Sequence, residues 1–264
     1  MLGRAYFKLR GIEQALEGKV DPVNETVEIN EMNYAVDKLP FDIPIIGTVY
    51  GTLLNDQGAY EALEPSMHHA PYKKPPHAPI LYIKPENTLT CFGSPIPFPK
   101  DTSMLEVGAT LGIVIGKDAT RVTKEEALDY VFGYTVVNDV TIPHQSVHRP
   151  AVKEKARDGF CPIGPWVMKR DAVPSPNDLY IRVWVNDQLQ QENHTSRLVR
   201  SVEQLLVDVT EFMTLSAGDL LLVGVFKEPP LVKEHDHVRI EIEGVGVLEN
   251  RVMKEGVWLG GEKR

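Results

Sequence analysis

Asp139 is the first residue of this sequence whose position suggests chemistry. It stands in the stretch VVNDVTIPHQ (136–145), directly after an apolar run that is typical of a strand. A carboxylate at a strand end can point into a cleft and act on a bound ligand. An Asp at such a place also commonly forms a turn or accepts a backbone N–H, and the residues by themselves favour that structural role.

Cations follow in the stretch KEKARDGFCPIGP (153–165), which includes Lys155, Arg157 and Asp158. The Gly- and Pro-rich part suits a rigid pocket wall whose backbone amides approach a ligand. Lys155 and Arg157 could hold a substrate carboxylate, Arg157 through two hydrogen bonds at once. A solvated, charged surface loop is the alternative. Lys84, at the end of another apolar run, could neutralise an anion as well.

Composition limits the kinds of partner. The chain has 264 residues, 42% of them hydrophobic, and a formal net charge of −9. An acidic balance of this size argues against binding nucleic acid or an anionic membrane, but not against a local basic pocket. The sequence shows neither an apolar run of transmembrane length nor the apolar core of a signal peptide. The two cysteines, Cys91 and Cys161, are expected to be plain buried thiols in a reducing, cytoplasmic location.

The elements that must position these residues are expected to be mostly strands. Residues 1–42 are short β-like pieces that predict a small N-terminal lobe, with 37–44 as a linker, and residues 43–264 predict the main domain. A turn is predicted at Asn186–Asp187. Alternating or apolar patterns predict strands at 23–31, 80–84, 110–116, 179–187 and 238–252.

Two helices are signalled by capping residues. Thr123 and Glu126 form a capping-box pattern that opens a helix ending at Gly133. Ser201 and Gln204 open a second helix that ends near Gly218. Its apolar face is expected to consist of Val202, Leu205, Leu206, Val209, Phe212 and Met213. The segment 56–79 could contain a short helix; the rest of it is either a lid or a solvated connector.

Taken together, several stretches resemble the fumarylacetoacetate hydrolase family. They are YIKPENTLTCFGSPIPFP, GIVIGK, GYTVVNDVT, KARDGFCPIGPWV, VNDQLQQ, EFMTLSAGDLLLVG and VRIEIEGVGVLENRV, in this order. The resemblance implies a mostly β fold with some α, a mixed β-roll that is usually dimeric. PYKKPPHAPILYIKPENT, VGATLGIVIGKDATRV and RPAVKEKARDGFCPIG are similar in particular to the amino-terminal half of the bifunctional decarboxylase/isomerases of 4-hydroxyphenylacetate (homoprotocatechuate) breakdown.

The resemblance also implies a metal centre, in which Mg²⁺ or Mn²⁺ chelates a 2-oxo acid and stabilises an enolate. Two glutamates one residue apart on a strand supply ligands in the family, and those positions are Gly108 and Thr110 here. The third ligand is present as Asp139, and the family's lysine as Lys155. Glu106 shares the face of Gly108, and a register shift could bring it in, although a slip of one residue would not, because it exchanges the faces.

Other family positions have changed. An arginine that follows the ligand Asp falls on Ile142 or Pro143, and the threonine of a Gly-Thr-Pro motif falls on Val225, after Gly224. The resemblance therefore implies Lys155 and Asp139 as catalytic residues and Asp139 as the remaining metal ligand. Substrate contacts are expected from Lys84, Arg157, Asp158 and Gly224.

The function implied is a decarboxylase/isomerase, or its subunit, acting on 5-oxopent-3-ene-1,2,5-tricarboxylate and 2-hydroxyhepta-2,4-diene-1,7-dioate. One alternative is a catalytically degenerate subunit that supports a metal-binding homologous chain. Another is a family hydrolase or 2-oxo acid decarboxylase. The expected partners are a small dianionic or trianionic 2-oxo acid and a second chain, in a homodimer or in a hetero-oligomer with a homologous subunit that corresponds to the carboxy-terminal half.

Overall fold

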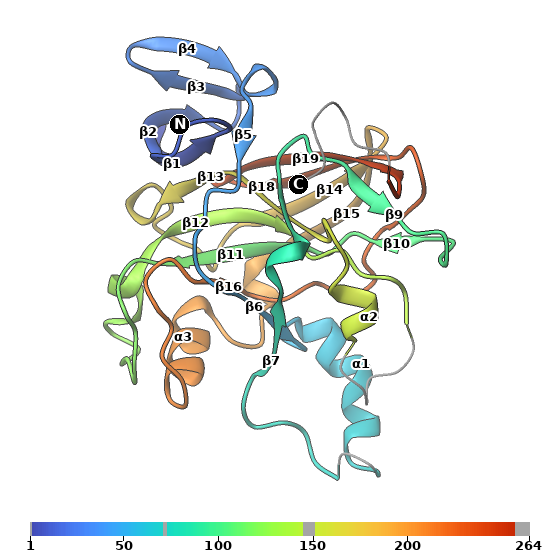
Figure 1. Cartoon of the computed structure of the whole chain (residues 1–264). Coiled ribbons are helices and arrows are strands. Elements are labelled where there is room, and N and C mark those ends of the chain that lie inside the picture. Colours follow the sequence, from blue (N-terminus) through green and yellow to red (C-terminus); the bar gives the residue numbers. More distant parts are fainter. Residues whose placement is uncertain (1, 71–72, 145–150, 257–264) are drawn as a thin grey trace.

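The computed structural model describes residues 2–70, 73–144 and 151–256, and within these ranges most elements are strands (Figure 1). The largest sheet in this part of the chain has twelve strands. Ten of them follow one hydrogen-bonded path, in the order β4 (Met32–Ala35), β3 (Thr26–Ile29), β2 (Leu16–Asp21), β1 (Gly3–Leu9), β13 (Cys161–Lys169), β12 (Val131–Asn138), β11 (Ala109–Ile115), β16 (Leu220–Leu222), β6 (Val49–Leu53) and β7 (Ile80–Lys84). The other two are β5 (Phe41–Asp42), which pairs with β1, and β8 (Leu89–Cys91), which pairs with β13.

A second sheet of five strands packs against the first. Its order is β15 (Gln188–His194), β14 (Tyr180–Val185), β18 (His237–Ile242), β19 (Gly246–Lys254) and β9 (Ile96–Phe98). A separate short pair joins β10 (Leu105–Glu106) to β17 (Leu231–Val232). The α-helices of the described residues are α1 (Gln57–Met67), α2 (Val152–Lys155) and α3 (Val202–Thr210). The predicted fold class, mostly β with some α, is confirmed.

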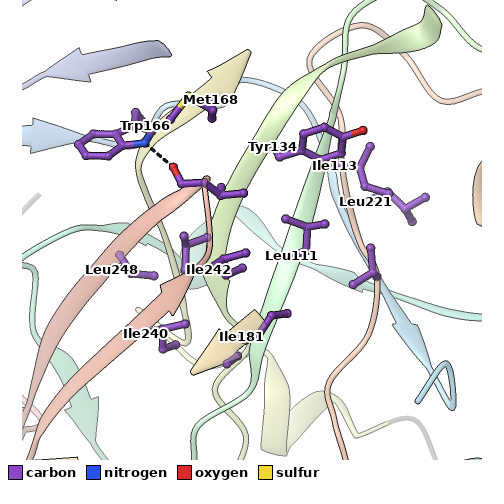
Figure 2. Packing of buried hydrophobic residues seen from close by; sticks show 14 of the residues in the cluster. Leu111, Ile113, Tyr134, Trp166, Met168, Ile181, Leu221, Ile240, Ile242 and Leu248 are labelled. Carbon is purple, nitrogen blue, oxygen red and sulfur yellow. Dashed lines mark hydrogen bonds between the residues drawn. The ribbon is translucent and has the colours of Figure 1, made fainter. Parts of the chain in front are cut away.

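The main core lies between the two sheets (Figure 2). Leu111 of β11 lies near Ile242 of β18 in this layer, whereas Ile113 lies beside Tyr134 and Leu221, and all these side chains are buried. Trp166 closes one end by donating its indole N–H to the carbonyl of Val245 at 2.7 Å. Every residue of β11 is buried, which explains why its sequence is apolar except for Thr110 and does not alternate.

A smaller apolar cluster covers the opposite face of the large sheet. Val114, Val137, Ile163, Leu220 and Leu222 are among its members. Side chains alternate along a strand, so residues an even number apart share a face. Gly108 and Asp139 therefore continue the face that Val114 and Val137 direct towards this cluster. The smaller cluster thus leads directly to the residues that the sequence singled out.

The N-terminal strands extend the large sheet. β1 pairs with β13 through Ala5 and Tyr6, while β2, β3 and β4 continue outward from it. Phe41 packs edge-on against Trp166, with ring centroids 6.2 Å apart, so aromatic contacts also join this region to the core. The division at residues 42 and 43 stays a prediction, and residues 257–264 of the predicted main domain lie outside the described residues.

One predicted helix is wrong. Residues 127–130 form a single 3₁₀ turn, and β12 begins at Val131. Half of the predicted capping box exists, since Glu126 accepts the N–H of Thr123 at 3.1 Å. The buried strand β12 includes apolar residues that the sequence assigned to the helix, so only one helical turn precedes it.

The second predicted helix is confirmed as α3, but it is shorter than expected. Ser201 caps it by accepting the N–H of Gln204, and the helix ends at Thr210. Phe212 therefore lies beyond the helix, where it is exposed and not part of the apolar face. The short helix expected within 56–79 is present as α1, whose first turn Asp56 caps.

The strand predictions are confirmed more closely. Residues 80–84 form β7, and the predicted strand at 110–116 is β11. Asn186 and Asp187 both have positive φ values, 49° and 63°, in the two-residue turn between β14 and β15. The predicted strand at 238–252 is a hairpin of β18 and β19, and the one at 23–31 shortens to β3.

Among the described residues, none of the helices combines the length and the apolar character needed to cross a membrane.

Candidate active site

Asp139 is the centre of a buried charged cluster at the end of β12. Its Oδ1 lies 2.9 Å from Nζ of Lys84, and its Oδ2 accepts a hydrogen bond from Nζ of Lys155 at 2.7 Å. The phenol of Tyr82 donates a short hydrogen bond to the same Oδ2. The Asp139 side chain is fully buried, so three groups from β7 and α2 replace the water that it would otherwise bind.

Strand alternation explains how β7 contributes two of these groups. Tyr82 and Lys84 are two residues apart and therefore point to the same side, while Ile83 between them is exposed. Gly51 on the neighbouring strand β6 is opposite Tyr82. A Cβ atom at Gly51 would lie 2.1 Å from the Tyr82 ring, so only glycine leaves room for the phenol in this position.

Lys84 donates two hydrogen bonds inside the protein and forms an ion pair with Asp139. Its ammonium group donates to the backbone carbonyls of Lys155 at 2.6 Å and Phe160 at 2.9 Å, besides pairing with Asp139. The side chain has no exposed surface. Lys84 therefore holds Asp139 and the start of β13 in place, and it could bind a substrate carboxylate only by releasing one of these partners.

Lys155 differs because 15% of its side chain remains exposed. It donates to Oδ2 of Asp139 and to Oγ1 of Thr141, both at 2.7 Å, and its Nζ lies 4.9 Å from the centroid of the Tyr82 ring. An ammonium group that is oriented by two hydrogen bonds and still accessible can meet the negative charge of a ligand.

Electrostatics fix the protonation of this cluster. Burial raises the pKa of Asp139, but the charges of Lys155 and Lys84 and the hydrogen bonds outweigh it, so the pKa lies well below the usual range. Burial and the Asp139 charge raise the pKa of Tyr82 well above its ordinary value, which keeps the phenol protonated as a donor. Burial also raises the pKa of the nearby Cys161 thiol to about 12, although the Lys84 charge opposes this.

The residues at the family's metal positions do not fit a divalent ion. A Cβ at Gly108 would lie 2.2 Å from the backbone oxygen of Asp139 and 3.1 Å from Cγ2 of Val225, so a longer side chain has no room there. Thr110 is fully buried, and its Oγ1 accepts the N–H of Gly224 at 3.2 Å. Mg²⁺ and Mn²⁺ require several hard, anionic oxygen ligands, and neither position supplies one.

The remaining carboxylate is not free for a metal either. Both oxygens of Asp139 already contact ammonium groups. In the part of the chain that the structure describes, no three His, Cys, Asp or Glu side chains gather closely enough to hold a metal. The charge that an ion would bring to this place is instead carried by Lys84 and Lys155, two positive groups beside one negative group.

Glu106 ends the short strand β10, two residues before Gly108. Its backbone pairs with that of Thr141, with Glu106 N to Thr141 O at 2.8 Å and Thr141 N to Glu106 O at 3.3 Å. The side chain is half-buried. Burial raises the pKa of its carboxyl group, and the positive charge of Lys155 only partly opposes this.

The other predicted site residues lie around this cluster. Gly224 approaches through its contact with Thr110, and its φ of +118° favours glycine. Arg157 instead pairs with Asp101 at 2.7 Å, and Asp158 accepts a hydrogen bond from Asn87 at 2.7 Å. The structure thus brings Asp139, Lys84 and Lys155 into direct contact, and it directs Arg157 and Asp158 to other partners.

The stretch 153–165 is predicted to form a rigid loop whose backbone amides approach a ligand, but the structure has a strand and inward-facing carbonyls there. Residue Cys161 already begins β13, and the groups that face the charged cluster from this region are the carbonyls of Lys155 and Phe160. The residues alone did not identify Tyr82 and Thr141 as site residues. The spacing of two between Tyr82 and Lys84, and between Asp139 and Thr141, is the signal that could have found them.

Comparison with known proteins shows the family. The family profile described as "Fumarylacetoacetate (FAA) hydrolase C-terminal" matches residues 48–253, so this chain belongs to the fumarylacetoacetate hydrolase family. A bifunctional isomerase/decarboxylase of 4-hydroxyphenylacetate degradation from Escherichia coli is 39% identical over 209 residues. These residues make up 79% of this chain but 48% of that protein, so the chain spans about half the length of the curated relatives it matches.

Solved structures agree with the fold. A 2-hydroxyhepta-2,4-diene-1,7-dioate isomerase from Mycobacterium marinum is 25% identical, with a TM-score of 0.74. The match covers 97% of this chain and 99% of that one. A maleylpyruvate hydrolase from Sphingobium sp. SYK-6, solved with manganese(II) and pyruvate, is 26% identical. Its TM-score is 0.70, and the match covers 85% of this chain and 77% of that one. Relatives of this chain thus include isomerases, decarboxylases and hydrolases.

Proposed function

We propose that this chain is a decarboxylase/isomerase, or a subunit of one, in 4-hydroxyphenylacetate breakdown. Its substrate is 5-oxopent-3-ene-1,2,5-tricarboxylate, or the decarboxylation product 2-hydroxyhepta-2,4-diene-1,7-dioate. The similarity to the Escherichia coli enzyme and to the Mycobacterium marinum isomerase supports this substrate class. The observation that carries the proposal is the accessible Lys155 ammonium, held in position by Asp139 and Thr141.

The chemistry needs an electron sink, and the substrate already contains one. Loss of CO₂ from carbon 2 of the tricarboxylate sends an electron pair through the neighbouring double bond to the keto oxygen. The product is a dienolate, whose negative oxygen needs a nearby positive charge. An ammonium group fixed by a buried carboxylate supplies that charge without reorganising during the reaction.

Each residue then has a role. Lys155 stabilises the enolate oxygen, and Asp139 and Thr141 orient the Lys155 ammonium group. Lys84 holds Asp139 ionised, and Gly224 lines the site beside Thr110. Contacts of Lys84 and Arg157 with substrate carboxylates, and a contact of Asp158 with the substrate, remain proposals. Those of Arg157 and Asp158 require release from Asp101 and Asn87.

The purified chain tests the proposal directly. It is mixed with the tricarboxylate, alone and together with a homologous chain corresponding to the other half of the bifunctional relatives, and CO₂ is followed. We expect turnover by the chain alone. Absence of turnover under both conditions contradicts the proposal.

One observation favours a second candidate function. Gly108 and Thr110 lack the carboxylates that the family uses, and the chain corresponds to half of the bifunctional relatives. The chain could therefore be a degenerate subunit that stabilises a metal-binding homologous partner in a hetero-oligomer. Turnover only when the partner chain is present supports this candidate. A family hydrolase or 2-oxo acid decarboxylase activity has less support, because it depends more on a bound metal.

A further inference from the structure

The two proposed reactions make different demands on a proton donor. Decarboxylation of the tricarboxylate leaves its electrons on the keto oxygen and gives the enol 2-hydroxyhepta-2,4-diene-1,7-dioate without forming a C–H bond. Conversion of that enol into its keto isomer does form a C–H bond. The second reaction therefore needs an acid that reaches a carbon atom of the bound dienolate, and this inference rests on the function proposed above.

Most ionisable groups of the cluster cannot supply this proton. Asp139 is held as a carboxylate by Lys84 and Lys155. Tyr82 is half-buried and gives its only hydroxyl hydrogen to Asp139. The Cys161 thiol is fully buried, and the buried Lys84 donates to two carbonyls and pairs with Asp139.

Glu106 occupies the right place. Glu106 and Thr141 are directly opposite each other in an antiparallel bridge, so their side chains project from the same face and are neighbours. The Thr141 hydroxyl in turn accepts a hydrogen bond from Lys155. Thr141 is therefore the residue that neighbours both Glu106 and the Lys155 ammonium group, which is proposed to contact the enolate oxygen.

The surroundings of this carboxyl group suit proton transfer. The charged groups that act on it are Lys155 of α2, His144 and Asp139, and among the described residues it has neither an ion pair nor a side-chain hydrogen bond. Burial raises its pKa, so a larger fraction is protonated near neutral pH than for an exposed Glu. His144 is the other titratable group nearby, but it is exposed and its Nδ1 lies 3.0 Å from the carbonyl of Ile142.

We propose that Glu106 is the catalytic acid that protonates carbon in the isomerase reaction. The enol hydroxyl gives its proton to water, and the resulting dienolate oxygen lies against Lys155. The Glu106 carboxylic acid then transfers its proton to the dienolate carbon, the new C–H bond forms, and the keto group is restored. The hydronium ion formed in the first step returns its proton to the Glu106 carboxylate, so the protons balance.

Glu106→Gln tests this assignment, because it keeps the shape of the side chain and removes the acid. CO₂ release from the tricarboxylate and ketonisation of 2-hydroxyhepta-2,4-diene-1,7-dioate are measured separately, after subtracting the rates without enzyme. We expect ketonisation to fall about 100-fold or more, in the usual range for loss of a general acid, while CO₂ release is unchanged. Glu125→Gln, at an exposed position far along the chain, is the matched control and should leave both rates unchanged.

The other outcomes are equally decisive. Wild-type protein without either activity contradicts the proposed function, and Glu106 then loses its role with it. Wild-type protein that releases CO₂ but does not accelerate ketonisation overturns the assignment of Glu106 alone. So does a Glu106→Gln variant with unchanged ketonisation, or one that loses both activities equally. Selective loss of ketonisation in His144→Gln, with Glu106→Gln unaffected, assigns the acid to His144 instead.

Discussion

Replacing Lys84 by Met removes one positive charge from the buried cluster while keeping the length of the side chain. In the native protein the Lys84 ammonium lies 2.9 Å from Asp139 and donates to the carbonyls of Lys155 and Phe160. The variant leaves both carbonyls without this donor, and Asp139 keeps only Lys155 and Tyr82. We expect a substantial loss of stability, because the Asp139 side chain is buried and water cannot replace the lost Lys84 ammonium group.

The magnitude follows from two contributions. Breaking a buried ion pair from one side typically costs about 3–5 kcal/mol, and the remaining contacts of Asp139 offset part of this. The Phe160 carbonyl still accepts the N–H of Val140 at 3.1 Å, so only the Lys155 carbonyl loses its donor, which adds about 1–3 kcal/mol. The free energy of unfolding should therefore fall by about 3–5 kcal/mol, a large fraction of the 5–15 kcal/mol that is roughly typical of a protein.

Urea unfolding followed by tryptophan fluorescence measures this difference. The midpoint should shift to lower urea, with the slope unchanged. Lys155→Met is the matched comparison, because Lys155 is partly exposed and loses fewer buried partners, so its cost should be nearer 1–3 kcal/mol, roughly that of hydrogen bonds to charged groups. A loss below about 1 kcal/mol in Lys84→Met, within the range of an ordinary surface substitution or little above it, would refute the view that Lys84 holds a buried charge.

Other substitutions in the cluster give further predictions. Lys155→Met should lower kcat for CO₂ release by about 100- to 1,000-fold, as expected for loss of an oxyanion-stabilising donor, and an unchanged kcat in steady-state assays would contradict its role. Gly108→Glu should destabilise the protein by about 1–3 kcal/mol through overpacking against the Asp139 carbonyl, without creating Mn²⁺ binding in calorimetry; tight Mn²⁺ binding would argue otherwise. The lowered pKa of Asp139 contributes stability above the unfolded-state pKa of roughly 3.9, and this contribution is lost as the pH falls towards the folded-state pKa. The stability gap between wild type and Asp139→Asn should therefore be widest near neutral pH and narrow on acidification below about pH 4; a gap that urea unfolding finds independent of pH would count against the ion pairs. Tyr82→Phe should cost about 1–3 kcal/mol, the usual value for a hydrogen bond to a charged group, and thermal unfolding at neutral pH would show whether it is instead neutral.

The sequence identified the strand ends better than the helices. Asp139 and Lys84 both follow apolar runs, and such runs predict buried strands whose ends can reach a site. The helix expected from Thr123 was wrong because its capping pattern is local, whereas the pairing of β12 with β11 and β13 depends on residues far away in the sequence.

The details of the site depended on the same long-range pairing. Period two predicts that Tyr82 and Lys84 share a face, but it does not reveal that both meet Asp139, since β7 and β12 are separated by three strands in the sheet. The exclusion of a side chain at Gly108 depends on the close approach of the Asp139 carbonyl, which results from the pairing of two segments thirty residues apart. The absence of the two glutamates, in contrast, could be read from the sequence alone.

The central claim is that the ammonium groups of Lys84 and Lys155, with Asp139 between them, act in place of a metal ion. The most direct test is the rate of CO₂ release from 5-oxopent-3-ene-1,2,5-tricarboxylate by the purified chain in excess EDTA and in excess Mn²⁺. Equal rates under the two conditions are the predicted result. Activity that disappears in EDTA and returns with Mn²⁺ would contradict the claim.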